Sequence, residues 1–306
     1  MSRVTSIQEL NTLKESINNG RNFSKQVLIC GGTGCISSGS NEIAEEMEKR
    51  VKALGKENEI RVIKTGCFGF CEKGPIVKML PDNTFYTEVE LKDVEKLVEK
   101  HLVNEEKVEE LLFVDPVSKK RISDSDHMDF YKKQKRIALR NCGLVDPENI
   151  EDYFLHNGYT ALNKVISLPQ QEVIDIIKNS GLRGRGGAGF STGLKWQFAL
   201  NNKADQKYVV CNADEGDPGA FMDRSILEGD PHSIIEAMAI CGYAIGANKG
   251  LVYIRAEYPL AIKRLKIALD EAKEYGLLGK NIYNTDFSFE IEIKYGAGAF
   301  VCGEET

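Results

Sequence analysis

The chain has 306 residues, of which 42% are apolar and 28% charged, and its formal net charge is −6. At roughly 150 residues per domain this length predicts about two domains, and the composition excludes a disordered or collagen-like chain. The negative charge argues against nucleic-acid binding, which requires a basic face. There is no apolar run of about 18 residues and no signal-peptide core, so we expect a cytoplasmic protein without membrane insertion.

The first third of the chain alternates strand and helix patterns. A capping box at Ser6 and Glu9 predicts a helix that ends near Gly20, and a second box at Thr87 and Glu90 predicts a helix from there to about Leu102. A further helix is expected at 41–54, and strands at 26–30, 59–64, 75–80 and 84–87. The order β-α-β-β-β-α over residues 25–105 matches a thioredoxin-like domain, so the fold class is α/β.

Four of the eight cysteines lie in two loops that each follow a strand, with the spacing Cys-x4-Cys and Cys-x3-Cys: Cys30, Cys35, Cys67 and Cys71. Four thiolates with nearby glycines, whose amides approach closely, are typical of a [2Fe-2S] cluster. Zinc and thiol chemistry stay open as alternatives, although residues 1–100 contain no histidine and the spacing is at the margin of the zinc pattern. In a reducing compartment a disulfide framework is not expected.

Residues 106–127 have mixed charge and little periodicity, which indicates a linker. Residues 128–306 then alternate helix and strand patterns, typical of a second α/β domain. The predicted helices are 130–142, 149–155, 158–165, 169–180, 234–244 and 259–275, and the predicted strands are 208–211, 250–254 and 289–293.

The segment Gly181–Phe190 is rich in glycine and contains Gly-x-Gly-x-x-Gly at Gly184, Gly186 and Gly189. The pattern is weak as a dinucleotide fingerprint because it follows a predicted helix instead of a strand. Bare amides beside Arg183, Arg185 and Lys195 nevertheless form a cradle for an anion. Together with the aromatic rings of Phe190 and Phe198, this cradle indicates a ligand that has a phosphate and a planar ring. The alternative is a flexible surface turn without a ligand.

Two further loops follow predicted strands. The first contains Asn212, Asp214 and Glu215, and the second runs from Gly296 to Thr306. Ligands of open α/β sheets bind beyond the carboxyl ends of strands, where an amide suits a flavin edge and carboxylates suit ribose hydroxyls. A solvated acidic loop or a hard-cation site is the alternative for the first.

These motifs carry two resemblances. Residues 25–105 resemble the thioredoxin-like ferredoxin domain of NADH dehydrogenases, which binds [2Fe-2S] through the same Cys-x4-Cys and Cys-x3-Cys spacing. Residues 128–306 resemble the FMN- and NADH-binding flavoprotein subunit of NADH dehydrogenase, with its three loop motifs in order. The fusion of both is similar to the flavoprotein subunits of NAD-linked, electron-bifurcating [FeFe]-hydrogenases and of formate dehydrogenases.

The resemblance implies hydride transfer from NADH to FMN, followed by single-electron steps to iron–sulfur clusters, with no residue acting as general acid or base. It implies that Phe190 and Phe198 stack on the adenine of NADH, and that Glu215 and Glu305 lie near the nicotinamide nucleotide. Arg185 belongs to the implied phosphate cradle. The implied FMN contacts are Gly184, Gly186, Gly187, Lys195, Asn212, Asp214, Gly303 and Glu304.

In the family, the last motif is followed by further domains that hold a [4Fe-4S] cluster, so we expect this chain to be truncated and to retain FMN weakly. The implied partners are the other subunits of an NADH dehydrogenase, hydrogenase or formate dehydrogenase, and ferredoxin. The alternative function is a ferredoxin-like or docking module without NADH turnover of its own. His156 and His232 are interpreted as structural, because neither has an apparent nucleophile partner.

Overall fold

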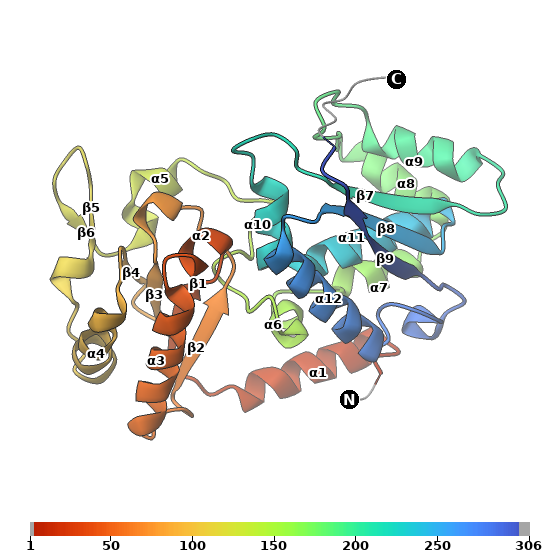
Figure 1. The fold of residues 1–306 in the computed structure, drawn as a ribbon. Coiled ribbons are helices and arrows are strands. Elements are labelled where there is room, and N and C mark those ends of the chain that lie inside the picture. The colour runs from red at the N-terminus through yellow and green to blue at the C-terminus, as the bar shows by residue number, and fades with distance from the viewer. Residues whose placement is uncertain (1–2, 300–306) are drawn as a thin grey trace. The chain divides into compact units, whose positions relative to one another are not determined.

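The computed structural model describes residues 3–299, which form two compact units (Figure 1). One unit comprises residues 17–147 and 228–230, and we call it the cysteine unit. Of the described residues, the other comprises 3–16, 148–227 and 231–299, and we call it the glycine-loop unit. Each unit draws on more than one chain segment, so the units do not follow the predicted boundaries at 105 and 128.

The cysteine unit is built on a four-stranded sheet of order β2-β1-β3-β4. β1 (Lys25–Cys30) pairs in parallel with β2 (Ile60–Thr65) and antiparallel with β3 (Val77–Leu80), which pairs antiparallel with β4 (Thr84–Tyr86). The parallel pairing sets Cys30 opposite Thr65, so both cysteine loops leave the sheet at one edge. The predicted thioredoxin-like order of elements is therefore present.

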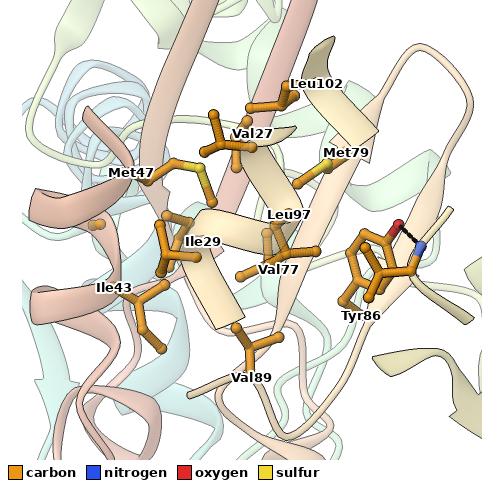
Figure 2. Close-up of a cluster of buried hydrophobic side chains, with 14 of the residues drawn as sticks. Val27, Ile29, Ile43, Met47, Val77, Met79, Tyr86, Val89, Leu97 and Leu102 are labelled. Carbon is orange, nitrogen blue, oxygen red and sulfur yellow. Dashed lines mark hydrogen bonds between the residues drawn. The ribbon is translucent and has the colours of Figure 1, made fainter. Parts of the chain in front are cut away.

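A cluster of buried apolar side chains covers one face of this sheet (Figure 2). Val27 and Ile29 of β1 meet Met47 of α3 (Ser40–Ala53) and Leu97. Tyr86 belongs to the cluster, and its hydroxyl oxygen accepts a hydrogen bond from the Val108 amide, 3.1 Å. This bond ties the chain beyond residue 105 to the sheet.

The helix at residues 91–103 begins later than predicted. The backbone amides of Thr87, Glu88 and Val89 donate to carbonyls of other segments, which holds these residues outside the helix. The capping box instead joins Glu90 and Asp93, with the Glu90 amide 2.9 Å from Asp93 Oδ2. The helix has three parts: a 3-10 turn (Leu91–Asp93), α4 (Val94–Lys96) and a π-helical stretch (Leu97–Val103).

Residues 106–147 also differ from the prediction. In place of a linker there is a hairpin of β5 (Phe113–Val114) and β6 (Arg121–Ile122), anchored by the buried side chain of Phe113. The helix expected at 130–142 is reduced to α5 (Asp129–Lys132), followed by turns. Repulsion among the positive charges at 132–136 opposes a continuous helix, and tertiary hydrogen bonds of Arg136 replace it.

The glycine-loop unit contains a parallel three-stranded sheet of order β7-β8-β9. Its strands are β7 (Tyr208–Ala213), β8 (Lys249–Arg255) and β9 (Glu290–Gly296), and their carboxyl ends share one edge. Helix α11 (Pro231–Ile245) packs on β7 and β8. On β7 buried residues alternate with exposed ones such as Val210, which is 61% exposed, so the other face of this strand is open.

The remaining helices of this unit agree with the predictions except for two that the sequence analysis did not anticipate, α9 (Thr192–Asn201) and α10 (Met222–Gly229), whose last two residues belong to the cysteine unit. The predicted ones are α6 (Ile150–Leu155), α7 (Thr160–Ile166), α8 (Gln170–Asn179) and α12 (Pro259–Glu274). Helix α1 (Ile7–Gly20) begins in this unit, where the Val4 amide donates to the Tyr275 carbonyl, 2.8 Å. Among residues 3–299, no helix is long and apolar enough to span a membrane.

Candidate functional site

The four predicted cysteine ligands come together at one edge of the cysteine-unit sheet. Cys30 is the last residue of β1, and Cys35 lies in the short helix α2 (Thr33–Ile36), where the sequence had indicated only a loop. Cys67 and Cys71 lie in the loop that follows β2. Cys30 and Cys35 are buried, whereas Cys71 is exposed, so the site lies near the surface on one side.

The sulfur atoms are close enough to share metal ions. Cys67 Sγ lies 3.7 Å from Cys71 Sγ, and two thiolates bound at about 2.3 Å to one tetrahedral metal lie about 3.8 Å apart. A hydrogen bond with Cys35 raises the pKa of the Cys30 thiol to about 12, and one with Cys30 raises that of Cys67 to about 11. Contacts between neighbouring thiols therefore link all four sulfur atoms. Among residues 3–299, no group of three or more His, Cys, Asp or Glu side chains has the arrangement of a single-ion site.

Glycines give the cluster site its shape. A Cβ atom on Gly32 would lie 2.9 Å from Cys67 Cβ, and one on Gly74 would lie 2.6 Å from Cys35 Sγ. The Gly69 amide donates to Cys67 Sγ at 3.2 Å, as amides do to the sulfurs of iron–sulfur clusters. Four thiols, close backbone approach and an amide donor on a ligand sulfur fit a [2Fe-2S] cluster.

The predicted glycine loop connects α8 to α9 and is closed by backbone hydrogen bonds. The Gly184 amide donates to the Phe190 carbonyl, 2.8 Å, and the Thr192 amide to the Leu182 carbonyl, 3.0 Å. Gly187 has φ +102°, a conformation that favours glycine. A Cβ placed on Gly186 or Gly187 would have no atom within 4 Å other than those of its chain neighbours. The backbone at both positions is thus open to a ligand.

A cavity of about 570 Å³ lies beside this loop, within the size range of small-molecule and cofactor sites. Of the predicted FMN and NADH contacts, Gly184, Gly186, Phe190 and Lys195 line it. The ring centroids of Phe190 and Phe198 are 6.4 Å apart, and both rings are exposed. Glycine amides, a lysine and an aromatic ring around one cavity fit a flavin phosphate and its flat ring. Further lining residues that the sequence analysis missed are Trp196, Tyr208, Val210 and Cys241.

The acidic loop after β7 is not among the residues that line this cavity. The Asn212 side-chain oxygen accepts from the Asp214 amide at 3.0 Å. The Glu215 carboxylate accepts from the Asp223 and Arg224 amides at 3.1 and 3.2 Å, which satisfies free N–H groups at the start of α10. Glu215, expected near the nicotinamide, is therefore occupied as a helix cap.

The other predicted residues fall into three groups. Arg185 and Gly187 belong to the glycine loop but do not line the cavity. His232 is buried between the Tyr159 hydroxyl, 3.0 Å from Nδ1, and Glu271, 3.2 Å from Nε2, in agreement with the structural role expected for it. Gly303, Glu304 and Glu305 lie outside the described residues.

Comparison with known proteins identifies two family models in this chain. Residues 3–102 match the thioredoxin-like [2Fe-2S] ferredoxin model, and residues 177–306 match the Nuo51 FMN-binding domain. These matches confirm the predicted fold class, an N-terminal thioredoxin-like ferredoxin domain followed by an FMN-binding domain. They also confirm, at the level of the families, the predicted [2Fe-2S] and FMN cofactors; neither model concerns a [4Fe-4S] cluster.

Among curated proteins, the chain is 71% identical over 175 residues to a subunit of the NADP-reducing hydrogenase of Solidesulfovibrio fructosivorans. It is 51% identical over 158 residues to a subunit of the NADH-quinone oxidoreductase of Aquifex aeolicus. These alignments cover 57% and 52% of the chain but only 36% and 37% of the relatives, so the chain spans little more than a third of their length. A solved structure of the thioredoxin-like [2Fe-2S] ferredoxin from Aquifex aeolicus is 29% identical, with a TM-score of 0.28 over 30% of this chain and 99% of that one.

Proposed function

We propose that this chain, in which a thioredoxin-like [2Fe-2S] ferredoxin domain precedes a Nuo51-type FMN-binding domain, is the electron-entry part of a flavoprotein that oxidises NADH or NADPH. The cavity beside the glycine loop carries this proposal, because it joins open amides, Lys195 and Phe190 around a volume that fits FMN. When bound, FMN accepts a hydride from a reduced nicotinamide and releases electrons singly.

The residues of the chain bind and orient the reactants. The Gly186 amide and the Lys195 ammonium group bind the phosphate, and Gly184, whose own amide donates to the Phe190 carbonyl, lines the same cavity. Phe190 and Phe198 offer exposed rings to an adenine. Cys30, Cys35, Cys67 and Cys71 hold the [2Fe-2S] cluster. Asn212, near the end of β7, and Asp214, just after it, complete the proposed FMN contacts together with Gly303 and Glu304.

The partners that we propose are subunits of a larger redox complex. One relative is named for a hydrogenase and another for an NADH-quinone oxidoreductase, so a hydrogenase or quinone-reducing partner is proposed for this chain, with formate dehydrogenase subunits and ferredoxin as further partners. Assays with NADH and NADPH in parallel would identify the donor.

Anaerobic titration tests the proposal. Protein reconstituted with iron, sulfide and excess FMN is expected to lose its flavin absorbance when NADH or NADPH is added. Lys195→Ala should weaken FMN binding by about tenfold, or about 1.4 kcal/mol, since it removes a charge-assisted contact. Lys203→Ala, an exposed lysine that does not line the cavity, is the control. Flavin that stays oxidised with both nucleotides would contradict the proposal.

The second candidate, a ferredoxin-like or docking module, is favoured by the acidic loop, which contributes no residue to the cavity lining. It predicts an electron paramagnetic resonance (EPR) signal from a chemically reduced cluster, but no flavin bleaching by either nucleotide. The same titration therefore separates the two candidates.

A further inference from the structure

Each of the two ligand loops of the proposed cluster is held by a charged side chain from outside the segment that matches the ferredoxin family. Arg136 contacts the loop of Cys67 and Cys71, and Glu228 contacts the loop of Cys30 and Cys35. Both residues lie beyond residue 102, where the ferredoxin match ends, and Glu228 falls within the Nuo51 match. All these residues belong to the cysteine unit.

Arg136 presents a positive charge to the loop between Cys67 and Cys71. Its Nη2 donates to the Phe68 carbonyl, which also accepts from the Tyr131 hydroxyl at 3.1 Å, and its Nη1 lies 3.5 Å from the Cys142 carbonyl. A Cβ on Gly69 would lie 2.6 Å from Nη2, so the loop passes directly beside the guanidinium. Within residues 3–299, Arg136 has no carboxylate within salt-bridge distance, and its Nε is buried without a hydrogen-bond partner.

Glu228 presents a negative charge to the other loop. The residue is only 2% exposed, and its carboxylate accepts from both the Thr33 amide, 3.0 Å, and the Thr33 hydroxyl. Thr33 opens the short helix that carries Cys35. The adjoining backbone is in close contact too, because Gly229 packs on Gly66, beside Cys67.

We propose that Arg136 and Glu228 are positioning residues that set the reduction potential of the [2Fe-2S] cluster in opposite directions. Reduction adds one negative charge to the cluster. A nearby cation stabilises the reduced form and an anion opposes it, and both effects are strong where water is excluded. Arg136 therefore raises the potential and Glu228 lowers it. The inference rests on the cluster assigned under the proposed function.

The test is an EPR-monitored redox titration of the full chain with its cluster reconstituted. Arg136→Gln should shift the midpoint potential to more negative values, and Glu228→Gln to more positive values. Arg136→Lys, which keeps the charge, should restore most of the wild-type potential. The control variants are Arg140→Gln, which removes an exposed positive charge, and Glu45→Gln, which removes an exposed negative charge. Both should leave the midpoint potential nearly unchanged.

Opposite shifts support the inference, whereas shifts of the same sign, or none, overturn it, because a loosened site would move both variants alike. If Glu228→Gln does not retain the cluster, Thr33→Val tests the role of Glu228 in its place. It keeps the carboxylate but removes a donor to it, so the potential should become more negative, and an unchanged or higher potential would overturn the role of Glu228. Iron and sulfide assays distinguish failure of this inference from failure of the proposed function. If the reconstituted wild-type protein contains no iron, the proposed cluster itself is overturned.

Discussion

Glu236 is a buried carboxylate that joins three segments of the glycine-loop unit. It is 6% exposed and accepts from the Tyr153 hydroxyl at 2.6 Å, the Tyr159 amide at 2.9 Å and the Leu162 amide at 3.0 Å. Buried donors that lose their acceptor cost about 1–3 kcal/mol each. The residue therefore stabilises the fold without taking part in the proposed chemistry.

We expect Glu236→Ala to lower the free energy of unfolding of this unit by about 3 kcal/mol, because several buried donors would lose their acceptor. Chemical denaturation followed by circular dichroism measures the change. Glu292→Ala, whose side chain is 64% exposed, should change it by less than about 0.5 kcal/mol. Equal effects of the two substitutions would show that Glu236 has no special role.

His232 links stability to pH. Burial lowers its pKa, and Glu271 and Glu236 offset this only in part. The unfolded chain, with a histidine pKa near 6.5, therefore takes up a proton at this site before the folded chain does. Stability is fully present above this pH and falls below it, by at most about 1.4 kcal/mol per pH unit for this group.

Denaturation at several pH values between about 7 and 5 checks this linkage. His232→Gln should reduce the pH dependence of the free energy of unfolding by up to about 1.4 kcal/mol per pH unit, the contribution of one proton. His101, whose pKa is also lowered by burial, accounts for part of the slope that is left. An unchanged slope in His232→Gln would contradict the assignment.

At the scale of elements, the crossing of the two cysteine loops depends on glycine. A Cβ on Gly32 would meet Cys67 Cβ at 2.9 Å, closer than such atoms approach, whereas one on Gly34 would lie 3.9 Å from Cys71 Sγ, an ordinary contact. The same substitution at two glycines only two residues apart therefore has two different expected outcomes.

We expect Gly32→Ala to lose most of the cluster and Gly34→Ala to retain it, as measured by iron and acid-labile sulfide per chain and by visible absorbance. The methyl group at position 32 pushes Cys67 away, and the four thiolates no longer converge. Retention of iron in both variants would indicate that the loops can move apart without losing the cluster.

At the scale of the whole molecule, the two cofactor sites differ in how they enclose their ligand. The proposed cluster has four cysteine ligands in two neighbouring loops, whereas the glycine loop exposes Gly184 and Gly186 to solvent. After gel filtration in high salt, we expect iron to remain near stoichiometric and FMN to be largely lost. Stoichiometric flavin after this step would contradict the expectation.

The sequence predicted most elements, and part of what lines the cavity, because their signals are local. Short apolar runs indicated all seven longer strands, and the spacing of four cysteines indicated the cluster. The prediction of a helix at 130–142 was wrong because Arg136 donates a hydrogen bond to the Phe68 carbonyl, which lies in a distant segment of the chain. The capping box at Thr87 failed because distant carbonyls hold that segment outside the helix.

The identity of the two cofactors, the order of the loops and the two domain families follow from the sequence alone, since they depend on residue type and spacing. Only the tertiary structure decided what surrounds the sites. It assigned residues 106–147 and 228–230 to the cysteine unit, set Arg136 and Glu228 against the ligand loops, and used Glu215 as a helix cap. Such contacts join residues that no local pattern relates, because each depends on how separate segments of the chain pack together.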